Sequence, residues 1–307
     1  MLYLSRIEDL TLTDTVNMGI PELKYIESVP AILQQSGISL KQKYFKEIID
    51  ISPEIGFLKI DIEKCLNEGV ILHVLERIKD KYLFSFHSNN LLLSSNQGTL
   101  NDKLIKLKIL AEKFNLLNIS MSATWSVLKG IPAVDFLPFP YNEKNLNIIS
   151  DNVMRIQDYL SRQILIENPM SYFEFKGNIS EPEFFMRMVE RTGCSLLLNL
   201  NNIYANSINH NFNPKNYVDI ISDNIIKEIH ISGHTKAKVN GKEKIIDISN
   251  NKISKEVWEL YSYTILEKGC IPTLVKWDYN LPEFSELLAE VNKCNEILKL
   301  NSYRNAA

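Results

Sequence analysis

Short apolar runs alternate with amphipathic segments along most of this chain. Residues 1–33 are mixed and show no clear period, and the alternation begins after them. Each apolar run has the length of a strand, and the segment after it has the length and spacing of a helix. The eight runs span residues 37–40, 55–62, 82–87, 117–122, 164–166, 195–200, 225–231 and 271–275. Repeated units of this kind predict a parallel sheet covered by helices.

The number of units favours one closed barrel. No linker or composition break divides the 307 residues, and barrels of eight strand–helix units reach this length as single domains. We therefore predict an α/β fold with a single (β/α)8 TIM barrel over residues 34–307 and an N-terminal extension over 1–33. An open doubly wound sheet is the alternative, but the chain has no GxGxxG or Walker-type loop to support it.

Three connections are expected to be irregular loops. The first follows the fourth run and contains Pro132, Pro138 and Pro140. The second follows the sixth run and passes through His210. The third is the polar stretch 235–252 after the seventh run.

Composition and charge narrow the class of protein. The formal net charge is −3 with both signs well mixed, which argues against binding driven by nucleic-acid phosphates. No apolar run is long enough to cross a membrane, and the first residues lack a signal-peptide pattern. The four cysteines are scattered without a CxxC pair. We expect a cytoplasmic, reduced protein that binds neither nucleic acid nor membrane.

Polar residues gather where the predicted strands end, which is where TIM barrels carry their function. Four of the five histidines belong to this set. Imidazoles and carboxylates at one mouth could bind a transition metal. A single histidine at a strand end is more often a hydrogen-bonded polar residue, but the coincidence of several favours a functional pocket. The candidates are Glu63, His87, Glu167, Asn168, Asn199, Asn202, His210, His230, His234, Asp247, Lys276 and Asp278.

Several segments together resemble the multinuclear non-heme iron-dependent oxidative enzymes, the MNIO family. They run in order from about residue 37 to 290, so the resemblance covers most of the chain. The matching segments are Phe84-Ser-Phe-His87, Asp135-Phe-Leu-Pro-Phe-Pro140, Gln157-Asp158, Ile164-Leu-Ile-Glu-Asn-Pro169, Arg191-Thr-Gly-Cys-Ser-Leu-Leu-Leu-Asn199, Asn201-Asn-Ile-Tyr204, Asn209-His210, Ile229-His-Ile-Ser-Gly-His234, Val257-Trp-Glu-Leu-Tyr261 and Pro272-Thr-Leu-Val-Lys-Trp-Asp278.

The resemblance implies a barrel that acts in the biosynthesis of ribosomally made peptides (RiPPs). Such enzymes oxidise a precursor peptide with iron and dioxygen. They usually work with a small partner protein that recognises the leader of the precursor, often by strand addition. The family's site positions match this chain at Glu63, His87, Glu167, Asn202, His210, His230, His234 and Asp247.

This chain departs from the family pattern at several metal-ligand positions. Lys59 and Lys276 stand where the pattern has glutamates, and Asn199 replaces an aspartate. Thr124 and Ser249 stand in place of histidines. A lysine ammonium repels a cation, and the lost carboxylates would have offset the charge of several irons. The site is thus expected to hold at most one or two ions, through some of His87, Glu167, Asn202, His230 and Asp247.

Three hypotheses remain open at this point. The chain is a divergent iron enzyme, with Glu167 and His230 in catalytic positions. Alternatively it is a degenerate, metal-free pseudoenzyme that serves as a scaffold for a peptide or a partner, with Lys276 bridging Glu167 and Glu63. The third hypothesis is a metal-independent enzyme in which Lys276 forms a Schiff base or His230 moves a proton.

Overall fold

The protein is described here by a computed structural model that covers residues 35–67, 69–89, 97–114, 116–128, 131–173, 175, 177–239 and 241–305. The predicted N-terminal extension over residues 1–33 lies outside the described residues. Its boundary with the barrel therefore stays a prediction.

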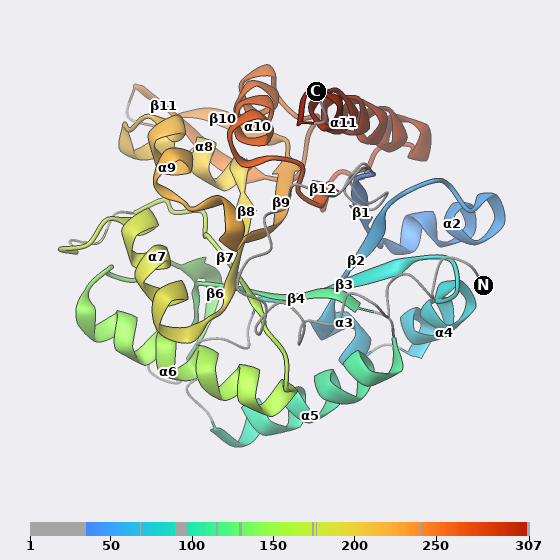
Figure 1. Cartoon of the computed structure of the whole chain (residues 1–307), viewed down its shortest axis with the longest axis horizontal. Helices are drawn as coiled ribbons and strands as arrows, with labels where there is room; N and C mark the ends of the chain where they lie inside the picture. The colour runs from blue at the N-terminus through green and yellow to red at the C-terminus, as the bar shows by residue number, and fades with distance from the viewer. Residues whose placement is uncertain are drawn as a thin grey trace.

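Eight parallel strands close into a barrel, which confirms the predicted (β/α)8 fold (Figure 1). Around the barrel the order is β1-β12-β9-β8-β7-β4-β3-β2, so the first and last strands of the chain pair with each other. The strands are β1 (Gly37–Ser39), β2 (Phe57–Asp61), β3 (Leu83–Ser88), β4 (Leu116–Ser122), β7 (Leu165–Glu167), β8 (Ser195–Asn199), β9 (Ile226–Ser232) and β12 (Thr273–Lys276).

Helices form a ring around this barrel (Figure 1). They are α2 (Phe45–Ile51), α3 (Ile62–Asn67), α4 (Gly69–Ile78), α5 (Gln97–Lys113), α6 (Glu143–Leu160), α7 (Glu181–Thr192), α8 (Leu200–His210), α9 (Pro214–Ile220), α10 (Lys255–Lys268) and α11 (Phe284–Asn305), with 3-10 turns η2 (Gln42–Tyr44) and η3 (Asp223–Ile225). None of the described helices is both long and apolar enough to span a membrane.

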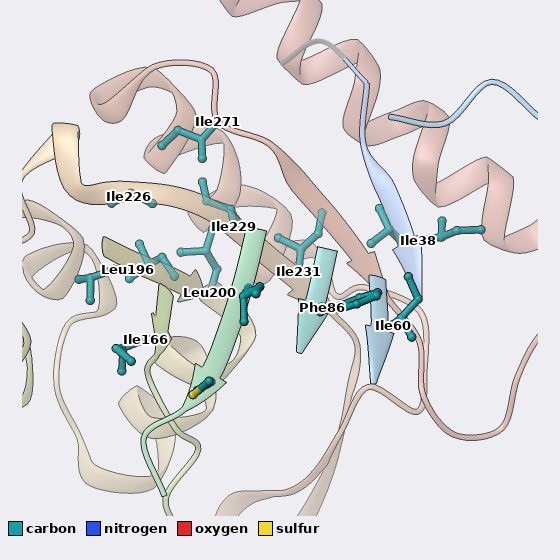
Figure 2. Packing of buried hydrophobic residues seen from close by; sticks show 14 of the residues in the cluster. Ile38, Ile60, Phe86, Ile166, Leu196, Leu200, Ile226, Ile229, Ile231 and Ile271 are labelled. Carbon is teal, nitrogen blue, oxygen red and sulfur yellow. The ribbon is translucent and has the colours of Figure 1, made fainter. Parts of the chain in front are cut away.

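The two faces of the barrel strands differ in chemistry. Successive side chains on a strand point to opposite faces. Ile60, Phe86 and Ile229 belong to the large apolar cluster and are fully buried (Figure 2). Their neighbours Lys59, Ser85, Glu228 and His230 are buried as well, but take part in polar contacts inside the barrel. The inside of this barrel is therefore a polar layer rather than a continuation of the apolar core.

The three connections expected to be irregular contain regular structure, so that part of the prediction was wrong. The stretch after β4 forms a hairpin of β5 (Trp125–Leu128) and β6 (Ile131–Leu137). The stretch after β9 forms a second hairpin, β10 (His234–Val239) with β11 (Lys242–Ile248). The loop through His210 is helix α8, whose asparagines make up for their low helix propensity by bonding neighbouring backbone.

Candidate functional site

Glu167, the last residue of β7, lies between two histidines from other strands. His87 Nε2, on β3, is 3.2 Å from Glu167 Oε2. His230 Nδ1, on β9, is 3.3 Å from Glu167 Oε1. All three side chains are buried, and the two imidazole rings are 6.3 Å apart. We call these three residues the mouth cluster.

In each histidine the imidazole nitrogen that faces away from Glu167 contacts a polar side chain. His87 Nδ1 is 2.8 Å from Ser120 Oγ, and His230 Nε2 is 2.8 Å from Glu228 Oε1. His230 therefore has a carboxylate oxygen at each ring nitrogen, and a carboxylate accepts a hydrogen bond from either N–H. The buried Nδ1 atom faces Glu167 and makes no hydrogen bond with the described residues. A carboxylate that holds the far nitrogen of an imidazole in this way is typical of histidines that bind metals.

A buried ion pair lies one layer deeper in the barrel. Lys59 Nζ, on β2, is 2.5 Å from Glu228 Oε1, on β9, and we call these two residues the floor pair. Ser85 and Asn118 donate to Glu228 Oε2 at 2.8 and 3.1 Å. Burial lowers the pKa of Lys59 in spite of its partner. Burial acts to raise the pKa of Glu228, but the adjacent Lys59 outweighs it and holds the pKa well below its usual range.

Glu167 accepts a hydrogen bond at each oxygen. Ser122 Oγ donates to Oε2 at 2.8 Å, and Asn199 Nδ2 donates to Oε1 at 2.9 Å. Burial alone would raise the pKa of Glu167, but His87, Lys276 and His230 together hold it well below 4.5. Burial lowers the pKa of His87 to about 4. At neutral pH the cluster therefore holds an ionised carboxylate beside a neutral His87.

Three asparagines anchor the backbone around Glu167. Asn168 Oδ1 accepts from the Asn199 backbone N–H at 2.7 Å, and Asn199 Oδ1 accepts from the Asn202 backbone N–H at 3.1 Å. Asn202 Nδ2 donates to the carbonyl of Asn168 at 2.9 Å. The Asn202 Oδ1 atom is buried and receives no hydrogen bond from the described residues. Among these three, Asn202 is thus the residue with an oxygen free for a ligand.

Lys276 pairs with Asp278 rather than with the carboxylates expected from the sequence. Its Nζ is 3.4 Å from Asp278 Oδ2, and Lys41 Nζ is 2.5 Å from Asp278 Oδ1. Glu63 accepts from Ser88 Oγ at 2.6 Å. A bridge from Lys276 to Glu167 and Glu63 is absent from the ion pairs of the described residues. The two lysines hold the pKa of Asp278 at about 2 against the effect of burial.

The other predicted residues lie away from the mouth cluster. His234 Nδ1 is 2.9 Å from Asn201 Oδ1, and its ring packs on Tyr204. His210, at the end of α8, contacts the carbonyl of Ser171 at 2.9 Å. The backbone of Asp247 pairs with Thr235 in the second hairpin, while its side chain lies outside the described part of the structure.

Backbone contacts close the base of the second hairpin. The Ser249 N–H donates to the carbonyl of Gly233 at 2.7 Å. A Cβ at Gly233 would lie 2.0 Å from the carbonyl oxygen of Asn251 and 2.3 Å from that of Lys252. Only glycine therefore allows the chain that leaves β9 to run this close to residues 251–252.

The sequence prediction missed Ser120 and Glu228 in the deeper layer of the site, and it noted Lys59 only as a departure from the family pattern, without its partner Glu228. The signal that identifies them is the strand period of two. Glu228 precedes His230 by two residues, and Ser120 precedes Ser122 in the same way. The inward-facing residues of the strands form successive layers inside the barrel. Considering every layer, instead of only the last residue of each strand, would have grouped these residues.

The described residues contain no group of three or more His, Cys, Asp or Glu side chains arranged around a metal position. The nearest arrangement is the mouth cluster, where two imidazoles each approach one oxygen of the same carboxylate. Two histidines and one carboxylate match the donor set of mononuclear non-heme iron sites. Lys59, Asn199 and Lys276 supply no bridging carboxylates, so this donor set does not fit a cluster of several ions.

Solved structures with a similar fold are known at low sequence identity. A xylose isomerase domain protein from Salmonella typhimurium superimposes with a TM-score of 0.57 at 12% identity, covering 87% of this chain and 98% of the other. The IOLI protein with a bound zinc atom gives a TM-score of 0.58 at 11% identity, covering 87% and 99%. At such low identity these likenesses support the barrel fold and nothing further.

Sequence relatives are nearer. A UPF0276 protein from Psychromonas ingrahamii is 37% identical over 264 residues, covering 85% of this chain and 93% of the relative. The UPF0276 protein VP3015 from Vibrio parahaemolyticus is 36% identical over 267 residues, covering 85% and 92%. The profile of the family described as RiPP precursor modification enzyme MbnB/TglH/ChrH matches residues 35–299. The chain therefore belongs to the MbnB/TglH/ChrH family, the MNIO group that its sequence resembles.

Proposed function

We propose that this protein modifies a ribosomally made precursor peptide at the mouth of its barrel, with a single iron ion held by the mouth cluster. The observation that carries the proposal is the pairing of two imidazole nitrogens with one carboxylate, His87 Nε2 and His230 Nδ1 facing Glu167 at 3.2 and 3.3 Å. His230 Nδ1 and Asn202 Oδ1 are buried and make no hydrogen bond with the described residues, so both atoms are candidate ligands.

Iron with dioxygen would supply the oxidising power for the reaction, as is usual for sites with two histidines and one carboxylate. The chain's own residues prepare the place for it. Glu228 orients His230 through Nε2, and Ser120 orients His87 through Nδ1. The ionised Glu167 would supply the negative charge that a cation needs. Lys276 limits that charge, which fits one ion better than several.

The family assignment supports a precursor peptide as the substrate. We propose in addition that a small, separate partner protein recognises the leader of that peptide. The open end of the barrel near Glu167 would then receive the residue to be modified.

Metal analysis of protein purified with iron supplied tests this proposal. We expect about one iron per chain, and loss of that iron in His230→Ala and Glu167→Ala. The matched control is His73→Ala, because His73 is an exposed histidine on α4. Protein that stays free of metal after anaerobic reconstitution would contradict the proposed iron site.

A second function, a metal-free scaffold for the peptide or a partner, has its own supporting observation. Ser122 and Asn199 already donate hydrogen bonds to both oxygens of Glu167, so the carboxylate is satisfied without a metal. The double variant Asn199→Asp/Lys276→Glu separates the two functions. If the chain is a scaffold with a blocked site, this variant gains iron that the unaltered protein lacks.

A Schiff-base enzyme is not supported. Burial acts to lower the pKa of Lys276, but Asp278, Glu167 and Asp61 outweigh it and raise the pKa above its usual range. The amine is therefore protonated at neutral pH and is not a nucleophile.

A further inference from the structure

A cavity of about 620 Å³ lies between the loop after β7, the chain that leads into α6, and the turn between α8 and α9. We call it the side pocket. Aromatic and aliphatic side chains make up most of its wall, among them Phe139, Phe173, Phe175, Phe212 and Ile220. Phe173, Phe175 and Phe212 are 65, 46 and 39% exposed. Exposed aromatic side chains around a cavity mark a binding surface more often than a structural one.

One carboxylate lies in this apolar wall. Glu181, in the first turn of α7, accepts from Tyr141 Oη at 2.9 Å and from Tyr217 Oη at 2.8 Å. It is only partly exposed, and burial raises its pKa to about 7 despite these two hydrogen bonds. The described residues that line the side pocket include no lysine and no arginine. Among the described residues of the wall, Glu181 therefore has no cation that would stabilise its charge.

Helix α8 connects the side pocket to the mouth cluster. Asn202, Asn206 and His210 are four residues apart and lie on one face of the helix. Asn202 Nδ2 donates to the carbonyl of Asn168 at 2.9 Å, and Asn206 Nδ2 donates to that of Pro169 at 3.0 Å. Further along, Asn206 Oδ1 accepts from the Ser171 backbone N–H at 2.8 Å.

His210 completes this row, with Nε2 2.9 Å from the Ser171 carbonyl. The row fixes the chain from Asn168 to Ser171 along the helix. Eight helical residues span about 12 Å. An extended peptide covers that distance with roughly three to four residues.

We propose that the side pocket binds a lysine or arginine side chain of the precursor peptide, three or four residues from the residue held at the mouth cluster. This inference rests on the proposed function, because it takes the peptide to be the substrate. It adds a specificity-determining subsite to the mouth cluster.

The chemistry of a basic side chain fits the wall and the carboxylate together. Its aliphatic stem would pack on Phe139 and Ile220, and its charged end would reach Glu181. The exposed rings of Phe173 and Phe212 offer faces on which a cation is attracted. An acidic side chain would be repelled by Glu181, and an aliphatic one would leave the carboxylate without a charge partner.

Fluorescence polarisation with short labelled peptides tests the side pocket. The probe is an acetylated peptide with one central lysine flanked by glycine and phenylalanine, and the matched probe has norleucine, which keeps the stem and removes the charge. We expect the lysine peptide to bind about tenfold more tightly, because a hydrogen bond to a charged group is lost with norleucine. Equal binding of the two peptides would overturn the proposal.

Two variants locate the effect. In Glu181→Gln the tenfold preference is expected to vanish, while in Glu183→Gln it is kept, because Glu183 lies on the same helix but pairs with Arg187. A melting curve of each variant checks that it folds. If Glu181→Gln is unstable, Phe212→Ala replaces it and should weaken both peptides alike. Loss of the preference in Glu183→Gln would also overturn the proposal.

The test is independent of the iron site. Glu167→Ala should abolish iron and leave the lysine preference intact, whereas Glu181→Gln should leave the iron content unchanged. A metal-free protein that still prefers lysine would contradict the proposed oxidation and retain the subsite. An iron-loaded protein with no preference for the lysine peptide would support the iron site and contradict the subsite.

Discussion

Burial acts to raise the pKa of both Glu167 in the mouth cluster and Glu181 in the side pocket, but the net pKa shifts of the two carboxyl groups have opposite directions. Each accepts hydrogen bonds from two side chains, Glu167 from Ser122 and Asn199, and Glu181 from two tyrosines. The pKa of Glu167 is held well below 4.5, whereas that of Glu181 rises to about 7. The number of hydrogen bonds is the same, so the difference comes from Lys276 and the histidines near Glu167. Charge in the surroundings, more than hydrogen bonding, decides which carboxylate stays ionised.

The largest effect is expected in the floor pair. Glu228→Gln leaves the Lys59 ammonium buried without its counter-charge, which should lower the free energy of unfolding by about 3–5 kcal/mol. Urea unfolding at pH 7 measures this loss. The double variant Lys59→Met/Glu228→Gln should recover most of the stability, because it removes both buried charges. If the single and double variants are equally unstable, the unpaired charge of Lys59 is not the cause of the lost stability.

A smaller loss is expected for Glu167→Gln. The amide has one acceptor oxygen instead of two and no charge, so it loses a hydrogen bond from Ser122 or Asn199 and the attraction of Lys276, which should cost about 1–3 kcal/mol at pH 7. Because the folded pKa of Glu167 lies below its usual 4.5, the stability it contributes is present above pH 4.5 and is lost as the pH falls below that value. Unfolding measured from pH 3 to 7 should therefore show the penalty shrinking in acid. A penalty that stays constant would mean that charge is not involved.

Glu181→Gln should change stability with the opposite sign. Because the folded pKa of about 7 exceeds the usual 4.5, the contribution of Glu181 is complete below pH 4.5 and is lost as the pH rises through 7. The glutamine variant should match the unaltered protein at pH 4.5 and exceed it by about 1–2 kcal/mol at pH 8, a figure reduced for the partial exposure of the side chain. Thermal melts across this range measure the difference. A variant that is less stable at pH 8 would show that the carboxylate is ionised and paired.

The smallest effect is expected for Glu183→Gln, on the solvent side of α7. Its ion pair with Arg187 at 2.5 Å is exposed, and such pairs contribute about 0–1 kcal/mol. The same unfolding measurements should show a change near the lower limit and little dependence on pH. If Glu183→Gln lowered the free energy of unfolding as much as Glu167→Gln does, buried and exposed carboxylates would not differ, and the comparison between them would fail.

The barrel could be predicted because its strands are apolar runs separated by amphipathic helices. The parts that were missed lack that pattern. Helix α8 carries asparagines, and its helical state depends on hydrogen bonds to the chain after Glu167. The second hairpin is rich in lysine, although the sequence pair Asn240-Gly241 is a hairpin signal that could have been used.

The sequence predicted the residues of the candidate site that lie near the strand ends, but not those deeper in the barrel. Glu167 is the last residue of β7, His87 and His230 lie within two residues of the ends of β3 and β9, and parallel strands bring such ends together. Glu228 lies one layer deeper, and its partner Lys59 comes from a strand 169 residues earlier in the chain. The direction of the Lys276 ion pair, to Asp278, depends on side-chain geometry that spacing does not encode. Glu181 was overlooked because the two tyrosines that surround it are distant in sequence.

The contact between Gly233 and Ser249 indicates where residues can be inserted or deleted in this protein. The second hairpin leaves the barrel and returns to it at one point, where the Ser249 N–H meets the Gly233 carbonyl. Figure 1 shows β10 and β11 on the outside of the barrel, beside α8. Residues added or removed at the Gly241 turn would be absorbed there without altering the register of β9. That turn is therefore a suitable place to graft a label or a recognition sequence.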